Sequence, residues 1–267
     1  MLASLGLVGG CGKGSRMKRR LTVICACVLA LTIFVPSEAL AEDFECNGTF
    51  AGGTFDNVVV PSGATCILKG ATVEGNISVK PTGALGLEGG IVGGNVESDT
   101  ARSIYIDCGL PLPGPQFGCR SIGVPPMIDG NVLIKKTFER PIFDNWICSA
   151  KIGGELHLEE NEEPFIVGDA EPTLSTAPGS MWCAPGEAFR LEVGGNVKAI
   201  KNSHRLDISD VSVGQNLQIF DNIDTAGGGG TYVYSNLVGQ DLQCDKNAPI
   251  QGGGNTAENK DGQCAAF

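Results

Sequence analysis

The sequence predicts an all-β protein, a parallel β-helix (β-solenoid) with coils of about 20 residues that is stapled by disulfides. Glycine accounts for 39 of the 267 residues, about twice its ordinary share of about 7%, which is typical of folds with very frequent turns. A short motif recurs at nearly regular spacing, and the segments between its copies alternate with a period of two residues instead of showing helical periodicity.

The recurring motif reads apolar-x-Gly-Asn-apolar-x-apolar, as in residues 73–79 and 213–219. If two of the intervals are double steps, the 165 residues from Asn76 to Asp241 make eight steps averaging 20.6, with degenerate copies near 103–107 and 165–169. An antiparallel sandwich would instead show hairpin dipeptides and irregular strand spacing. The fourth position of the motif falls at residues 76, 95, 131, 155, 196, 216 and 241, at intervals of 19, 36, 24, 41, 20 and 25.

Each coil is expected to hold two or three short strands joined by glycine or asparagine corners. The apolar positions of the motif should point inward and stack on their counterparts in neighbouring coils, while glycine permits the tight corner beside them. Asparagine tolerates left-handed backbone geometry and can bridge neighbouring backbones through its amide, so a column of asparagines predicts a repeated turn. That column stands six residues after the motif's fourth position, at Asn161, Asn202, Asn222 and Asn247.

An export signal is predicted at residues 17–41, and residues 1–16 have the character of an over-called start. Three basic residues precede an apolar stretch of 15 residues, which ends before the small-x-small cleavage pattern at 39–41. A membrane span needs about 20 residues, which argues against a retained anchor. A lipoprotein anchored through Cys27 has too little apolar chain before it. The mature protein is then a single β-helix domain of residues 42–267, with insertions near 108–126 and 159–190 and no membrane span.

The charge of the mature chain bears on its partners. Residues 1–41 contain five basic residues and one acidic residue, so 14 basic and 29 acidic residues remain in the mature chain, a net charge of −15. Nucleic acid is excluded as a partner, because phosphate binding needs clustered lysine and arginine.

Eight cysteines of the mature chain, an even number in an exported protein, indicate four disulfides. Zinc is excluded because the mature chain has no Cys-x-x-Cys and only two histidines, so no metal site is predicted among the cysteines. Residues one coil apart lie on adjacent rungs, close enough to be bridged, and this geometry pairs the cysteines at each end of the chain as clips. The predicted pairs are Cys46–Cys66 and Cys244–Cys264 as terminal clips, Cys108–Cys119 at the neck of a Pro-rich loop, and the remaining Cys148–Cys183.

Three aromatic residues are candidates for ligand binding. Phe117 lies in the Pro-rich loop, which is either a recognition loop or an insertion stapled for stability. Trp146 and Trp182 flank the last cysteine pair. Paired indoles stack on sugar rings when exposed and cover an insertion when buried, and burial is the favoured reading.

No catalytic constellation is evident in the sequence. The weak candidates are Asp207, Asp221 and Asp224 with His204, but 14 residues separate the first two acids, which does not place them one coil apart. His157 occupies a motif position expected to face solvent. The acidic run at 159–163 either binds Ca²⁺ weakly through its oxygens or forms a solvated loop. No other cofactor is predicted.

The repeats and the C-terminal segments 238–249, 252–256 and 261–264 resemble a group of exported bacterial right-handed parallel β-helix proteins of uncharacterised role. The resemblance implies the right-handed fold and covers most of the mature chain. More distantly, the chain looks like the bactofilins, polymer-forming β-helices that are cytoplasmic and lack this cysteine set.

The leading functional hypothesis is an exported structural or binding module of the bacterial envelope, periplasmic or extracellular, with a polysaccharide or an envelope protein as its partner. The alternative is a polysaccharide-active lyase or glycoside hydrolase. A self-assembling filament comes last, because clipped ends favour a monomer.

Overall fold

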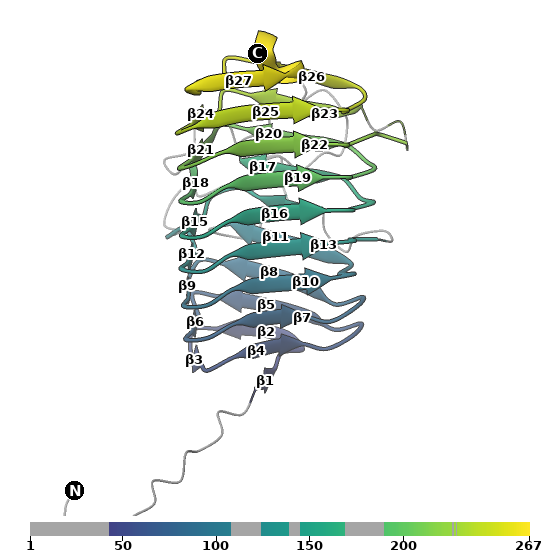
Figure 1. Cartoon of the computed structure of the whole chain (residues 1–267). Helices are drawn as coiled ribbons and strands as arrows, with labels where there is room; N and C mark the ends of the chain where they lie inside the picture. Colours follow the sequence, from purple (N-terminus) through teal and green to yellow (C-terminus); the bar gives the residue numbers. More distant parts are fainter. Residues whose placement is uncertain (1–42, 108–123, 139–144, 169–189, 226, 228) are drawn as a thin grey trace, which may run out of the picture. The chain divides into compact units, whose positions relative to one another are not determined.

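The computed structural model describes residues 43–107, 124–138, 145–168, 190–225, 227 and 229–267. Contacts divide the chain into Met1–Ala39 and Leu40–Phe267, and every described residue belongs to the second unit. These residues form 27 strands in three sheets, all parallel, and a C-terminal 3₁₀ helix, η2 (Gln263–Ala266). The chain winds from sheet to sheet and returns one rung higher on each coil (Figure 1). The predicted parallel β-helix is confirmed.

Sheet A has ten strands, which contain the apolar end of the repeated motif, and in Figure 1 most of them are stacked toward the viewer. Each strand pairs with its counterpart in the next coil without a register shift, so equivalent residues form columns across the coils. The strands, in spatial order, are β1 (Phe44–Glu45), β4 (Val58–Val60), β7 (Ile77–Val79), β10 (Val96–Asp99), β13 (Val132–Lys135), β16 (Leu156–Glu159), β19 (Val197–Ile200), β22 (Leu217–Phe220), β25 (Asp241–Asp245) and β27 (Asn259–Gly262).

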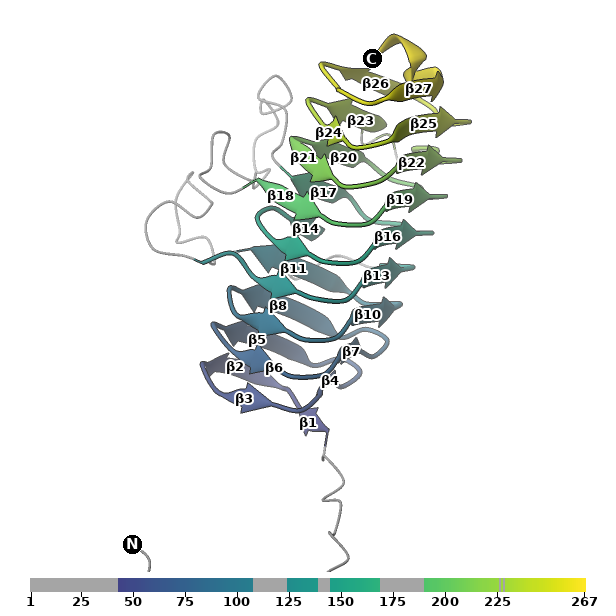
Figure 2. The same ribbon diagram turned by 60° about the vertical axis from the view of Figure 1, so that its left-hand side comes forward.

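Sheets B and C complete the coil, and Figure 2 shows the short strands of sheet C stacked beside sheet A. Sheet B consists of β2 (Gly48–Ala51), β5 (Thr65–Lys69), β8 (Ala84–Glu88), β11 (Ser103–Asp107), β14 (Asn145–Ile147), β17 (Phe165–Gly168), β20 (Leu206–Ser209), β23 (Thr231–Tyr234) and β26 (Ile250–Gly253). Sheet C consists of β3 (Thr54–Phe55), β6 (Thr72–Val73), β9 (Ile91–Val92), β12 (Met127–Ile128), β15 (Lys151–Ile152), β18 (Leu191–Val193), β21 (Val211–Val213) and β24 (Leu237–Val238).

The two long intervals between motif copies are single coils, so the prediction of double steps is wrong. Val96 in β10 pairs directly with Val132 in β13, and Leu156 in β16 pairs with Val197 in β19. The supposed degenerate copies are the sheet B strands β11 and β17. Extra residues between a sheet B strand and the next sheet C strand lengthen the coil and leave the strand register unchanged. Of the two predicted insertions, residues 124–126, 159–168 and 190 lie along the described coil path, and the rest lies outside the described residues.

The interior is one continuous hydrophobic cluster that runs from Cys46 to Cys264. Alternate residues of each strand point inward, so the motif's apolar positions stack in columns, as predicted. Burying such a side chain contributes about 1.5–3 kcal/mol, which is why so short a strand can hold its place. One column contains Val58, Ile77, Val96, Val132, Leu156, Val197, Leu217 and Leu242, all fully buried.

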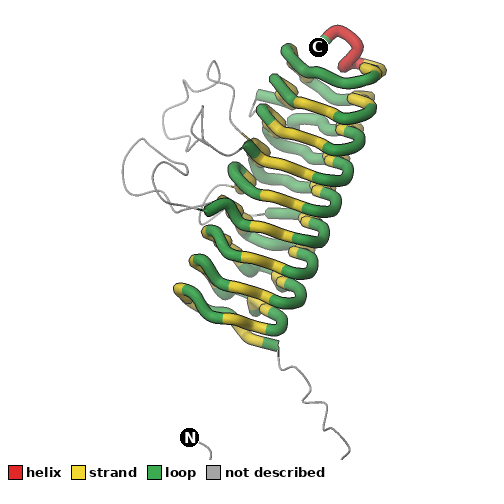
Figure 3. The backbone as a smooth tube through the Cα atoms, turned by 90° about the vertical axis from the view of Figure 1, so that its left-hand side faces the viewer, coloured by secondary structure: helices red, strands yellow, loops and turns green. Residues whose placement is uncertain are grey.

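The corners between sheets A and B stack coil upon coil at the right of Figure 1, and Figure 3 shows the same stacking of the coils from the side of sheet C. Asparagine was expected to take the left-handed conformation there, but the positive φ belongs to the preceding residue, such as Glu160 (φ 55°) or Lys201 (φ 56°). The asparagine itself uses its amide to bridge backbones, as predicted: Asn202 Oδ1 accepts from the backbone N–H of Asn161 at 3.0 Å. The left-handed residue turns the chain, and the buried asparagine completes the hydrogen bonds of that turn.

The motif needs glycine because the backbone of the neighbouring coil approaches too closely for a Cβ atom, and not because these positions have a positive φ. A Cβ atom on Gly153 would lie 2.5 Å from the backbone oxygen of Asp129, and one on Gly194 would lie 2.6 Å from that of Gly153. Real Cβ atoms do not come so close to backbone, so stacked corners of this kind accept only glycine at most of these positions.

Disulfides join the first two and the last two coils, which confirms the two terminal clips. Cys46–Cys66 and Cys244–Cys264 each span 20 residues with Cα atoms 5.3 Å apart. Cys148 is also disulfide-bonded, and its partner lies outside the described residues, as do Cys108, Cys119 and Cys183. The disulfides indicate that the protein folds in an oxidising compartment. Within the part of the chain that the structure describes, no helix is long and apolar enough to cross a membrane.

Candidate functional site

The outward faces of the sheets differ in exposure. In β11, Ile104 and Ile106 belong to the core, yet Tyr105 between them is also fully buried. The outward column continues through Trp146, Ile166, Asp207 and Tyr232, none more than 8% exposed. Sheet B is therefore covered on both faces over these coils. Sheets A and C keep outward side chains that are exposed or half-buried, so a ligand can be met on either of these two faces.

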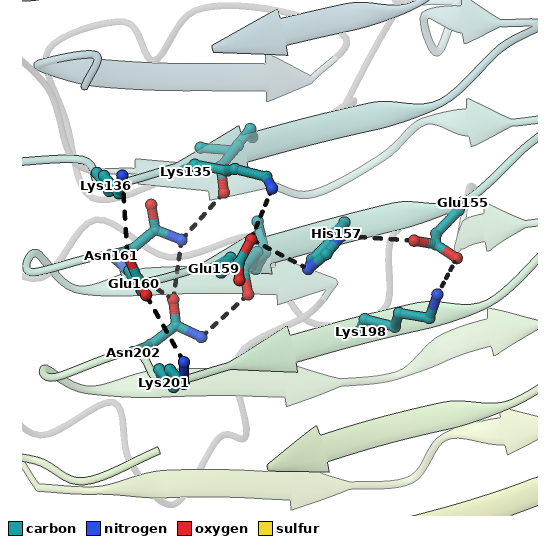
Figure 4. Close-up of polar contacts among 12 residues, drawn as sticks. Lys135, Lys136, Glu155, His157, Glu159, Glu160, Asn161, Lys198, Lys201 and Asn202 are labelled. Carbon is teal, nitrogen blue, oxygen red and sulfur yellow. Dashed lines mark hydrogen bonds and ion pairs between the residues drawn. The ribbon is translucent and has the colours of Figure 1, made fainter. Parts of the chain in front are cut away.

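A row of five charged or titratable side chains crosses the middle of sheet A (Figure 4). The row begins at Lys135 Nζ, 2.6 Å from Glu159 Oε2, whose carboxylate also lies 3.8 Å from His157 Nε2. On the other side, His157 Nδ1 lies 3.5 Å from Glu155 Oε1, and Glu155 Oε2 lies 2.7 Å from Lys198 Nζ. The row therefore alternates lysine, carboxylate, imidazole, carboxylate and lysine.

Strand alternation and one departure from the motif build this row. His157 and Glu159 are alternate outward residues of β16, while Lys135 and Lys198 belong to the neighbouring strands β13 and β19. Glu155 occupies the motif position that holds asparagine in most coils. Its backbone N–H still donates to Asn131 Oδ1 at 2.8 Å, as a ladder asparagine would, but its side chain turns to His157 and Lys198.

The electrostatics of the row are set by burial and by its ion pairs. Burial lowers the pKa of His157, and the two neighbouring glutamates oppose that effect only in part. The hydrogen bond between Lys135 and Glu159 raises the pKa of the lysine and lowers the pKa of the carboxyl group. The imidazole, whose neutral form is favoured by burial, thus lies between two carboxyl groups that each contact a lysine.

The predicted solvation of His157 is wrong, since its side chain is only 18% exposed and lies between two carboxylates. Its backbone position was predicted correctly on the outward face, but the neighbouring side chains cover the ring. Sequence reasoning missed Lys135, Glu155, Glu159 and Lys198 as members of one row. The signal that could have found the row was the glutamate in place of the motif's asparagine.

Two glutamates of the acidic run at 159–163 form ion pairs with lysines of the neighbouring coils. Glu160 Oε2 and Oε1 lie 3.9 Å and 3.8 Å from Lys136 and Lys201, one coil on either side, and Glu159 faces Lys135. No group of three or more His, Cys, Asp or Glu side chains that could hold a metal occurs among the residues with described positions. The run instead takes part in ion pairs between coils.

The four weak catalytic candidates lie on different elements. Asp207 in β20 is fully buried and faces Arg205 Nη2 at 3.4 Å, while His204 Nδ1 accepts the backbone N–H of Arg205 at 2.7 Å. Asp221 occupies a left-handed corner after β22. Asp224 Oδ2 accepts the backbone N–H groups of Gly229 and Gly230. Each of these groups has a structural partner or position, and their assignment to catalysis stays a prediction.

Of the aromatic candidates, only Trp146 lies among the described residues. It is 4% exposed and packs edge-on against Tyr105, with ring centroids 5.0 Å apart. An indole so buried does not present a stacking face to a sugar. Phe117 and Trp182 lie outside the described residues.

No family model matches the chain, and no curated protein or solved structure matches it either.

Proposed function

We propose that the protein is an exported, non-catalytic β-helix that works as a rigid structural or binding module of the bacterial envelope or the extracellular space. Disulfide clips on both terminal coils suit an oxidising compartment and protect the coil ends from opening. The predicted leader at 17–41 would supply the export route, and a polysaccharide or an envelope protein would be the partner on the open face.

The observation that carries the non-catalytic assignment is the compensation of charge in the central row of sheet A. A glycosidase needs one carboxyl group that is free to protonate a leaving oxygen and a second that faces the same bond. Glu155 and Glu159 instead each contact a lysine, at 2.7 Å and 2.6 Å, and share the same histidine. Such a row joins neighbouring coils through paired charges, and the hydrogen bond from Lys135 lowers the pKa of Glu159 instead of raising it.

A polysaccharide panel tests this proposal. The oxidised mature protein is incubated with soluble plant and bacterial polysaccharides, with and without Ca²⁺, and both product release and retention of intact polymer are followed. Retention without new reducing ends or unsaturated products is the expected result. Products that disappear in a Glu155→Gln, Glu159→Gln double variant of unchanged stability would show an enzyme and overturn the proposal.

A further inference from the structure

The outward face of sheet A is hollowed along its N-terminal half. One hollow of about 360 Å³ lies over β4, β7 and β10, and another of about 400 Å³ lies over β7, β10 and β13. Both are lined by Ser78, Lys80 and Glu97, so they form one groove that crosses the strands along the coil axis. The groove starts near Asp43 and ends at Lys135, where the charged row around His157 begins.

The lining of this groove offers polar groups that repeat from coil to coil. Asn57 Oδ1 accepts from the backbone N–H of Asn76 at 2.9 Å, and Asn76 Oδ1 accepts from Asn95 at 2.8 Å. The oxygens of this ladder are thus used, and within the described chain the amide nitrogens of Asn57 and Asn76 donate to no other residue. These two donors lie on adjacent coils, about 4.8 Å apart, whereas Asn95 Nδ2 of the next coil donates to Glu97 Oε1 at 3.2 Å.

The floor of the groove adds a mixture of apolar and polar contacts. The outward column of sheet A passes from Val59 through Ser78 and Glu97 to Leu133. Such a floor provides C–H surface beside hydroxyl and carboxylate groups, which matches a sugar ring with its C–H faces and hydroxyls. A linear glycan laid along the groove would meet apolar, hydroxyl and carboxylate groups in turn on successive coils.

The charges of the groove are predominantly negative. Asp43, Glu97 and Asp99 are exposed, and among the described residues none of the three forms an ion pair; Glu97 Oε1 accepts from Asn95 Nδ2 at 3.2 Å, and Asp99 pairs along the sheet with Lys135. Lys80 is the opposing exposed lysine, while Lys135 is already paired with Glu159 at 2.6 Å. An acidic groove on a chain of net charge −11 favours a cationic ligand over an anionic one.

We propose that this groove binds a linear polysaccharide that carries free amino groups. The inference rests on the proposed binding function and names its face and its ligand class. The carboxylates of Glu97 and Asp99 would pair with the amino groups of the sugar, and the asparagine amides would donate to its hydroxyls. A basic peptide is the less suitable ligand, because the groove crosses the middle of a sheet and exposes no strand edge for backbone pairing.

The test compares a soluble oligomer of glucosamine with its fully N-acetylated counterpart, which has the same backbone and no charge. Both are titrated into the oxidised mature protein in mildly acidic buffer, where the glucosamine amines are protonated. We expect the glucosamine oligomer to bind more tightly and to weaken as salt is added, because exposed charge pairs are screened. The double variant Glu97→Gln, Asp99→Asn should bind about five- to tenfold more weakly, a change of about 1–1.4 kcal/mol.

A matched control variant removes one aspartate charge and one glutamate charge outside the groove. Asp129 and Glu192 line a separate hollow at sheet C, so the double variant Asp129→Asn, Glu192→Gln should keep full affinity. Equal affinity for both oligomers would overturn the assignment to an amino-polysaccharide. Equal loss in the two double variants would overturn the groove as the site. Either result would leave the proposed polysaccharide-binding function intact. Failure to retain any polymer of the panel, in contrast, would overturn that function as well.

Discussion

Asn222 Oδ1 accepts two hydrogen bonds from Asn202 in the preceding coil, one from the backbone N–H at 2.9 Å and one from Nδ2 at 2.7 Å. Its own Nδ2 donates to Asn247 Oδ1 at 2.9 Å and to the carbonyl of Ala199 at 2.9 Å. The ladder runs from Asn161 to Asn247 through buried side chains, and Gln263 completes it at the C-terminal end.

Replacing Asn222 with alanine should destabilise the protein more than replacing Asn76. Asn222 is 1% exposed, so its loss leaves the backbone N–H of Asn202 buried without its acceptor, which costs about 1–3 kcal/mol. Asn76 is exposed, and water can replace its bond to Asn95. Chemical denaturation of both variants measures the difference. Equal losses would contradict the importance assigned to burial of the ladder.

Replacing Gly153 with alanine should destabilise the protein more than replacing Gly70 with alanine. The added Cβ at Gly153 would meet the Asp129 carbonyl oxygen at 2.5 Å, and relieving such overpacking costs about 1–3 kcal/mol or more. Gly70 has a positive φ of 61° but no atom within 4 Å of an added Cβ, so the left-handed backbone alone costs about 1–2 kcal/mol. The free energies of unfolding of Gly153→Ala and Gly70→Ala decide this. A smaller loss of stability in Gly153→Ala than in Gly70→Ala would refute the idea that close approach of the stacked corners requires glycine at this position.

His157 should make stability fall as the pH drops below about 6.5. Burial lowers the pKa of this histidine in the folded state, so the unfolded chain takes up the proton first and the free energy of unfolding decreases as the pH falls. The contribution is present above the unfolded pKa and is lost toward the lower folded pKa. His157→Gln should remove this part of the pH dependence.

The same pH titration separates His157 from its neighbours. The pKa of Glu159 is lowered from 4.5, so its contribution is lost only at more acidic pH, and the raised pKa of Lys135 acts above 10.5. Thermal unfolding of wild type and His157→Gln between about pH 8 and about pH 5 isolates the histidine. Parallel curves for the two proteins would argue against this assignment.

Removing the C-terminal clip should loosen mainly the last coil. The double variant Cys244→Ser, Cys264→Ser opens a loop closed across 20 residues, and a bridge of this span is worth about 3 kcal/mol. Coils of a solenoid contact only their neighbours, so hydrogen exchange should rise in β25 to η2 and little in β4 to β7. The matching variant Cys46→Ser, Cys66→Ser should show the reverse pattern. Uniform loss of protection in either variant would contradict local fraying.

Much of the fold could be predicted because each coil repeats the same local chemistry. The apolar positions of 73–79 and its copies alternate with the period of a strand, and a spacing of 20 residues placed Cys46 beside Cys66 and Cys244 beside Cys264. The double steps were mispredicted because the distance between motif copies is measured along the chain, whereas register is set by pairing in space. Extra residues inserted at a corner lengthen the interval between motif copies without adding a coil.

The candidate site was less predictable because it consists of residues from three strands. Lys135, Glu159 and Lys198 are separated by tens of residues and meet only when β13, β16 and β19 pair in register. The burial of His157 likewise follows from its neighbours and not from its place in the motif.

The sequence by itself determined the repeat, the inward columns of Val, Ile and Leu, the asparagine bridges and the two terminal disulfides, since each depends on local pattern and on one coil length. Only the tertiary structure decided which face is open. Tyr105 and His157 both occupy outward positions of their strands, yet the first is fully buried and the second is partly exposed. Alternation specifies to which side of a sheet a residue points, but exposure depends on what packs against that side, and that is decided by chain distant in sequence.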